Sequence, residues 1–203
     1  MSGLCTIGYS GRTISEFLRL LSESQVDVVC DVRSMPYSRF RPEFSRGQLK
    51  AQLNSVGIKY KFFGEELGAR PQDRACYENG QATYERISAA PFFRAGLDRI
   101  KKGAASLKLA LVCSEADPIE CHRAILVCRH LPQIHDHIHH IGASGSIESQ
   151  AMLEARLVSH HGLTPLPLIP DEKDWATAVR EAYALQSAAI AYREKAWPTE
   201  ELV

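Results

Sequence analysis

The stretch VCSEADPIECHR, residues 112–123, carries the densest group of reactive side chains in the chain. Cys113, Cys121, His122 and two kinds of carboxylate fall within it. A cysteine thiolate is both a nucleophile and a metal ligand, and histidine and carboxylates can move protons or bind metals. The stretch could therefore form a thiol-based active site, a metal site, or only a well-capped helix that contains a cysteine.

The order of residues within this stretch predicts the start of a helix. Asp117 suits the N-cap, Pro118 the first helical position, and Glu120 the third position of a capping box. Cys121 would then lie about one turn inside the helix, where the dipole and nearby cationic side chains favour the thiolate. The same spacing groups Cys121 with Cys128 on a buried face, so Cys121 is an inert core residue, a reactive thiol or a metal ligand.

Three neighbours of Cys121 are expected at the mouth of a ligand crevice. His122 and Arg123 follow it directly, and Glu115 stands just past the end of an apolar run, where a general base is useful. An ion pair between Glu115 and Arg123 is the alternative. We take Glu115, Cys121 and His122 as the candidate catalytic residues.

Short apolar runs alternate with helical patterns over most of the chain, which predicts an α/β fold. We expect a mostly parallel, doubly wound (Rossmann-like) sheet of about five strands, with residues 1–160 as the α/β domain. Residues 161–203 form a C-terminal helical extension with a long helix over 172–196, which could pair with a second copy to give a homo-oligomer. The predicted strands are residues 4–7, 26–32, 58–63, 107–113 and 137–141.

In such a sheet, ligands bind beyond the carboxyl ends of the strands. The turn at residues 8–12 follows the first strand, and the loop at 33–50 follows the second. That loop is locally basic and contains aromatic side chains, which suits a phosphate-bearing ligand, although its arginines could instead pair with acids elsewhere. Residues 64–80 form a long polar loop, a candidate lid or binding loop.

The composition is that of an ordinary soluble protein. The 203 residues contain 24 basic and 24 acidic side chains, so no global field attracts nucleic acid or a membrane. We expect neither a membrane span nor a secretory signal, and six cysteines without a disulfide pattern indicate a cytoplasmic location. The histidine run at 135–140 could bind zinc, but alternate residues of a strand are about 7 Å apart, which is wide for chelation of one ion. No metal or cofactor is predicted.

Four segments, TIGYSGRT, DVRSMPYSR, GIKYKFFGEELGAR and LVCSEADPIECHR, occur in that order between residues 4 and 158. Together they resemble the prokaryotic DUF488 family, a domain of unknown function, although Tyr9 stands where that family usually has histidine. The resemblance implies an α/β fold but no activity. With the loops above, it gives the predicted ligand-binding residues as Gly8, Tyr9, Ser10, Arg12, Asp31, Arg33, Pro36, Tyr37, Ser38, Arg39, Arg41, Cys113, Arg123 and His140.

Three functions remain open from the sequence. The favoured hypothesis is a protein that binds a phosphate-bearing ligand, a nucleotide or nucleic acid, in repair or base processing. The second is a thiol-dependent enzyme that uses Cys121 or Cys113. The third is a non-catalytic module that binds a partner through its C-terminal helix.

Overall fold

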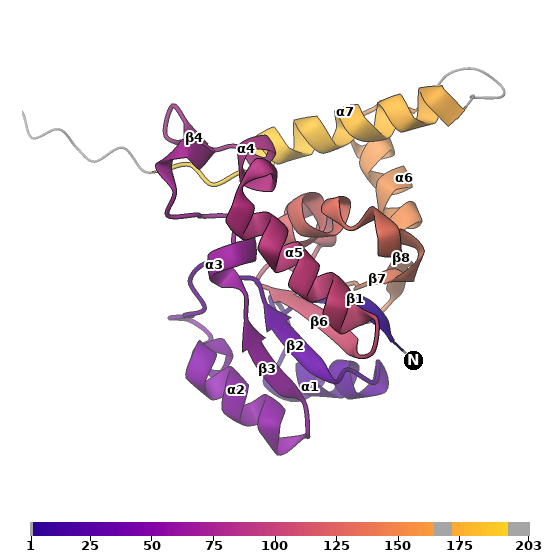
Figure 1. Ribbon diagram of the computed structural model, residues 1–203. Coiled ribbons are helices and arrows are strands. Elements are labelled where there is room, and N and C mark those ends of the chain that lie inside the picture. The colour runs from indigo at the N-terminus through magenta and orange to yellow at the C-terminus, as the bar shows by residue number, and fades with distance from the viewer. Residues whose placement is uncertain (1, 165–171, 195–203) are drawn as a thin grey trace, which may run out of the picture.

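A six-stranded sheet forms the centre of the protein (Figure 1), in a computed structural model that describes residues 2–164 and 172–194. The strand order is β3-β2-β6-β1-β7-β8; the first five strands are parallel and β8 is antiparallel to β7. The strands are β1 Gly3–Gly8, β2 Val28–Asp31, β3 Lys59–Phe62, β6 Lys108–Cys113, β7 Ile138–Ile141 and β8 Ile147–Ser149. The predicted mostly parallel α/β sheet is confirmed, with β8 as an additional edge strand.

Helices cover both faces of this sheet, as a doubly wound fold requires. Leu4 and Cys5, neighbours on β1, belong to two different buried clusters, one on each face. The helices α1 and α2 contribute to the cluster of Cys5, whereas α4, α5, α6 and α7 contribute to that of Leu4. The bounds are α1 Ile14–Glu23, α2 Arg46–Ser55, α4 Tyr84–Ala89, α5 Pro91–Ala104, α6 Gln150–His160 and α7 Glu172–Ile190.

Two helix ends form as their residues predict. The Thr13 side chain caps α1 by accepting a hydrogen bond from the backbone N–H of Glu16 at 3.2 Å. Gly57 follows α2 with φ of +78°, a left-handed conformation that glycine adopts without strain. These local signals therefore position the first two helices on their face of the sheet.

The polar stretch 64–80 is more ordered than expected. It contains the short helix α3 Gly64–Leu67, a 3₁₀ turn and strand β4 Tyr77–Glu78, which pairs with β5 Gln81–Ala82. Leu67 and Cys76 are buried, and they fix the segment to the core. The prediction of an irregular loop was wrong. Only a few apolar residues anchor this segment, so its sequence pattern showed neither a helix nor a strand.

The chain after Pro118 also differs from the prediction of a regular helix. Asp117 does cap a turn, but this is the 3₁₀ turn Pro118–Glu120, and it ends at Cys121. Cys121 itself has an extended backbone, with φ −132° and ψ 135°, and a π-helix Arg123–Val127 follows. Cys121 therefore does not lie inside a helix, and the helix dipole cannot explain its chemistry.

The C-terminal helix α7 packs against the α/β core and crosses the top of Figure 1. Its Gln186 is buried and donates a hydrogen bond to the carbonyl of Ile119 at 2.9 Å. The helix ends at Ile190, short of the predicted residue 196, and residues 165–171 and 195–203 of the predicted extension lie outside the described residues. None of the described helices has the length and apolar character needed to cross a membrane. The domain division at residue 160 and pairing with a second copy stay predictions.

Candidate functional site

The loops that follow β1, β2 and β6 meet at the carboxyl edge of the sheet. Since β6 lies between β1 and β2, backbone hydrogen bonds continue past the strand ends, from Tyr9 to Cys113 at 3.2 Å and from Ser10 to Ser114 at 2.9 Å. A Cβ atom on Gly8 would lie 1.7 Å from the carbonyl oxygen of Glu115. Only glycine permits this approach, so Gly8 sets the position of the loop that carries Glu115.

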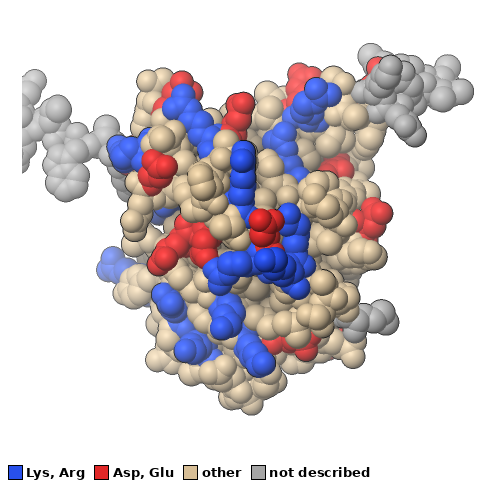
Figure 2. Space-filling view, viewed as in Figure 1, with Lys and Arg blue, Asp and Glu red and all other residues tan. Residues whose placement is uncertain are grey.

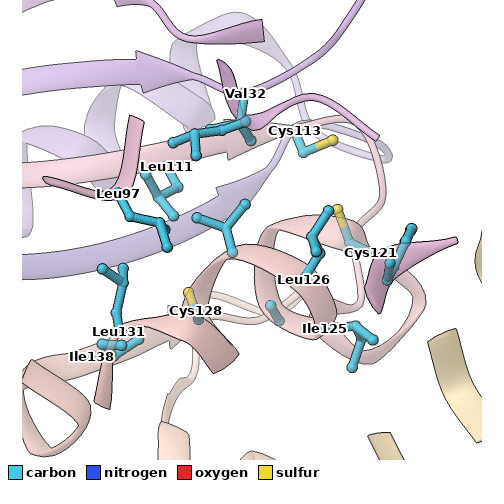
Figure 3. Close-up of a cluster of buried hydrophobic side chains, with 14 of the residues drawn as sticks. Val32, Leu97, Leu111, Cys113, Cys121, Ile125, Leu126, Cys128, Leu131 and Ile138 are labelled. Carbon is cyan, nitrogen blue, oxygen red and sulfur yellow. The ribbon is translucent and has the colours of Figure 1, made fainter. Parts of the chain in front are cut away.

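Four reactive side chains converge at this edge, and we call them the Cys-Glu-Cys-His cluster: Cys113, Glu115, Cys121 and His122. The Cys121 thiol donates to Glu115 Oε2 at 2.8 Å, and the Cys113 thiol donates to the same oxygen at 3.1 Å. Cys113 Sγ lies 3.6 Å from His122 Nδ1. One donor atom from each residue lies within 4.8 Å of the other three. In Figure 3, Cys113 and Cys121 lie at one end of a group of buried hydrophobic side chains, apart from Cys128.

The two thiols of the cluster differ in electrostatics. Burial alone would raise the pKa of Cys121, but a hydrogen bond with Cys113, the charge of Arg123 and contact with His122 lower that pKa well below its usual value. Burial and the neighbouring Cys121 raise the pKa of Cys113. Cys121 is therefore the thiol that ionises first.

The acid–base groups of the cluster respond to that thiol. Glu115 is exposed as a residue, but its carboxyl group is partly withdrawn from water among the cluster side chains; this desolvation and the proximity of Cys121 raise the pKa of the carboxyl. Burial disfavours a charged His122, but its hydrogen bond with Cys121 outweighs this and raises the pKa of the imidazole. A proton is thus shared among sulfur, carboxylate and imidazole within one small volume.

Backbone carbonyls fix the orientation of His122 and Arg123. His122 Nε2 lies 3.0 Å from the carbonyl oxygen of Val32, so Nε2 donates and Nδ1 faces Cys113. The fully buried Arg123 donates to the carbonyls of Glu115 at 2.6 Å and Ala116 at 3.1 Å. Its guanidinium holds the loop and lowers the pKa of Cys121, and its role in ligand binding stays a prediction.

A pocket of about 430 Å³ opens beside the cluster. Cys113, Glu115 and His122 line it, whereas Cys121 is almost completely buried beneath. Arg70 and Tyr192 also line this pocket, with the Arg70 guanidinium 4.3 Å from the Tyr192 ring centroid. The segment after α7 therefore contributes directly to the site.

The arginines predicted to grip phosphate make internal contacts. Buried Arg33 forms an ion pair with Asp31, with 2.6 Å between Nη2 and Oδ2, and its guanidinium lies over the Tyr9 ring. Arg12 donates to backbone carbonyls that follow β7, and Arg41 pairs with a neighbouring glutamate and with the Arg12 carbonyl. These side chains connect the loops, and their role in ligand binding stays a prediction.

The loop after β2 presents its other predicted residues in different ways. Tyr37 is 73% exposed and lines the pocket, while Arg39 is exposed. Ser38 Oγ accepts a hydrogen bond from the backbone of Arg41 at 3.1 Å, and the Pro36 carbonyl accepts from a backbone N–H of α2 at 2.8 Å. Of this loop, Tyr37 is the residue best placed to touch a ligand.

His140 lies in a buried polar chain behind the cluster. Arg123 Nε donates to Thr6 Oγ1 at 3.2 Å, and Thr6 Oγ1 lies 2.9 Å from His140 Nδ1. His140 Nε2 contacts Gln150 Oε1 at 2.9 Å, and Gln150 Nε2 donates to the Tyr183 hydroxyl at 2.7 Å. The chain joins the cluster to α7, so His140 is placed to support the site rather than to contact a ligand.

The histidine run at 135–140 does not form a three-histidine face. A 3₁₀ segment Pro132–His137 precedes β7, and His135 contacts Asp136 and Glu154, each at 3.1 Å. Within residues 2–164 and 172–194, the group whose donors could hold a metal ion is the Cys-Glu-Cys-His cluster. Thiolate and imidazole donors of this kind suit zinc.

Several lining residues escaped the sequence analysis: Arg70, Tyr84, Ile190 and Tyr192. Arg70 and Tyr192 are 122 positions apart in the sequence, so no local motif joins them. The Val32 carbonyl that orients His122 is a backbone group and leaves no side-chain signal. Their roles emerge only from the packing.

A model of the family described as domain of unknown function DUF488 matches residues 13–129, more than half of the chain. The chain belongs to the DUF488 family. The matched segment contains the second, third and fourth motifs and the whole Cys-Glu-Cys-His cluster, while Gly8 and its neighbours precede it. No curated protein and no solved structure matches this DUF488 protein.

Proposed function

We propose that this DUF488 protein is a thiol-dependent enzyme, with the Cys-Glu-Cys-His cluster as its reaction centre, acting on a small ligand that bears an anionic group such as phosphate. One observation carries the proposal: two thiols, a carboxylate and an imidazole meet within 4.8 Å beside a pocket at the carboxyl edge of a parallel sheet. This edge is where α/β folds bind ligands.

The cluster supplies the groups that such chemistry needs. Cys121 provides a sulfur whose ionised form is stabilised by the buried Arg123. Glu115 is exposed at the pocket, and its carboxyl shares a proton with Cys121, so it can give or take a proton beside a bound ligand. His122 occupies a fixed orientation next to Cys113.

Arg70 supports an anionic ligand. Its side chain is exposed, lines the pocket and stacks on Tyr192, and a guanidinium held flat in this way matches the oxygens of a phosphate or carboxylate. The exposed ring of Tyr37 lies in the same pocket and could stack on a base. A nucleotide is therefore the preferred class of phosphate-bearing ligand.

Nucleic acid is the second candidate ligand, and it would have to bind a surface that carries both basic and acidic side chains. Figure 2 shows basic side chains gathered on one face with acidic ones among them. Arg46, Lys50, Lys61 and Arg99 line a depression of about 420 Å³ together with acidic residues of α3. Because the Glu66 carboxylate pairs with Arg99, this surface offers a less continuous track for a phosphate backbone than a basic groove would.

Cysteine reactivity tests the reaction centre. We would dialyse the folded protein against a chelator, treat it with iodoacetamide at neutral pH, and follow each cysteine by peptide mass spectrometry. Cys121 has a lowered pKa and Cys113 lines the pocket, so at least one of the two should react at least about tenfold faster than Cys5 and Cys30, because burial raises the pKa of these two controls to about 12. Equal, slow modification of Cys113, Cys121 and the controls would refute the proposal.

A further inference from the structure

We infer that the Cys-Glu-Cys-His cluster binds a divalent zinc-class metal ion through Cys113 Sγ, Cys121 Sγ, His122 Nδ1 and a Glu115 carboxylate oxygen. The inference rests on the proposed function, since it assigns a cofactor to the same reaction centre. Its test is separate, because metal binding and thiol reactivity are measured independently.

The distances within the cluster suit a tetrahedral ion. Zinc bonds of about 2.0–2.3 Å place neighbouring ligand atoms roughly 3.3–3.8 Å apart. The contacts observed are 2.8 Å and 3.1 Å from the two sulfurs to Glu115 Oε2, and 3.6 Å from Cys113 Sγ to His122 Nδ1. Side-chain shifts of roughly 0.5–1 Å would convert these contacts into a coordination shell.

The donor types select the class of metal. Two thiolates and an imidazole favour zinc and other borderline or soft ions, whereas magnesium and calcium require oxygen ligands. When neutral, His122 has the tautomer that a ligand needs, since Nε2–H donates to the Val32 carbonyl and Nδ1 faces Cys113. Metal-binding histidines are commonly oriented by a backbone carbonyl in this way.

The charges near the cluster also match a divalent cation. Ionised Cys113, Cys121 and Glu115 would carry three negative charges, which a divalent ion and the adjacent Arg123 guanidinium together neutralise. Arg123 is fully buried and bonded to the Glu115 carbonyl at 2.6 Å, so its charge is fixed beside the site. Two thiolates this deeply buried need such compensation.

The ion would lie at the wall of the pocket. Cys121 is buried beneath the wall, whereas Glu115 is exposed and can leave an ion more readily than the other three donors. A ligand oxygen could then replace the carboxylate, with Arg70 available for the remaining charge. When bound, a zinc-class ion would supply Lewis-acid polarisation of that oxygen.

Cobalt substitution tests the inference on the full chain. The protein would be stripped with a chelator and its fold checked by circular dichroism, then titrated with Co²⁺ and, separately, with Zn²⁺. We expect about one equivalent of either ion, with intense tetrahedral cobalt bands and near-ultraviolet sulfur-to-cobalt charge transfer. Folded apoprotein that takes up neither ion, or a cobalt spectrum without sulfur charge transfer, would overturn the inference.

Variants assign the ligands. Cys113→Ser and Cys121→Ser should each lower cobalt affinity more than about tenfold and weaken the charge-transfer band. Cys128→Ser, a change at another buried cysteine, should leave both unchanged. If neither ion binds but Cys113 or Cys121 is alkylated ahead of Cys30, the metal site fails and the proposed function stands. If no ion binds and neither cluster thiol outpaces Cys30, both fail.

Discussion

Replacing His140 by glutamine should remove a large acid sensitivity from the stability of the protein. Burial and the nearby Arg123 lower the pKa of His140 from 6.5 to about 3. Protonation would also take away the Nδ1 acceptor that faces Thr6. The folded state therefore holds a neutral imidazole, whereas the unfolded chain protonates His140 normally.

The size and direction of the effect follow from this difference. Because the folded-state pKa is the lower one, unfolded chains bind the proton first as the pH falls below 6.5. Native stability should be unaffected by His140 above that pH and fall by about 1.4 kcal/mol per pH unit below it. The loss would be about 2 kcal/mol at pH 5 and about 5 kcal/mol near pH 3, comparable with the whole stability of many domains.

Urea unfolding between pH 8 and pH 4.5 measures this slope. His140→Gln should lower the free energy of unfolding at pH 8, because packing and a hydrogen bond are altered, but its profile should be flatter than that of the wild type below pH 6.5. The difference between the two profiles isolates His140 from the other titrating groups. Parallel profiles would refute the buried neutral imidazole.

Three further changes probe the site. Gly8→Ala places a methyl group against the Glu115 carbonyl and should cost about 1–3 kcal/mol in urea unfolding; an unchanged midpoint would contradict the close approach. Arg33→Met leaves Asp31 buried without its ion-pair partner and should cost roughly 3–5 kcal/mol, again by urea unfolding, and a neutral change would show that the pair is dispensable. Arg70→Ala should weaken binding of nucleoside monophosphates, measured by calorimetry, while the thermal midpoint stays within a degree or so; equal affinity would remove Arg70 from the ligand site.

Much of the sheet was predictable because its central strands lie in apolar runs, as buried parallel strands do, whereas β3 alternates lysine with aromatic residues. The strands β1, β2, β3, β6 and β7 all fall within or close to the predicted ranges. The short β8 has half-buried or exposed residues, and nothing in its three residues distinguishes it from a turn. Its pairing with β7 comes from tertiary contact alone.

The site was predictable in its members but not in its geometry. The sequence predicted that Cys113, Glu115, Cys121 and His122 lie at one edge of the sheet. It also predicted, wrongly, that Cys121 lies inside a helix. Asp117-Pro118 can start an α-helix or a 3₁₀ turn equally well, and local signals do not separate the two. The buried Arg123, bonded to carbonyls of the preceding loop, accompanies the extended backbone at Cys121.

The arginines show a second limit of predicting the site from the sequence. Their type predicted anion binding, but Arg33 and Asp31 are two positions apart and pair with each other in the folded chain. Arg70, in the segment predicted as a lid or binding loop, is the arginine that faces the pocket without such an ion pair in the described structure. Which charges remain available to a ligand is decided by long-range packing.

Turnover of small anionic metabolites tests the central claim most directly. Zinc-supplied wild-type protein would be incubated with a mixture of nucleotides and other phosphate-bearing metabolites, and each compound followed by mass spectrometry beside Cys121→Ser and Cys128→Ser. We predict that at least one compound is consumed, with matching product, by the wild type and Cys128→Ser but not by Cys121→Ser. Consumption that is equal in all three proteins, or absent from all, would contradict a reaction centre at the Cys-Glu-Cys-His cluster.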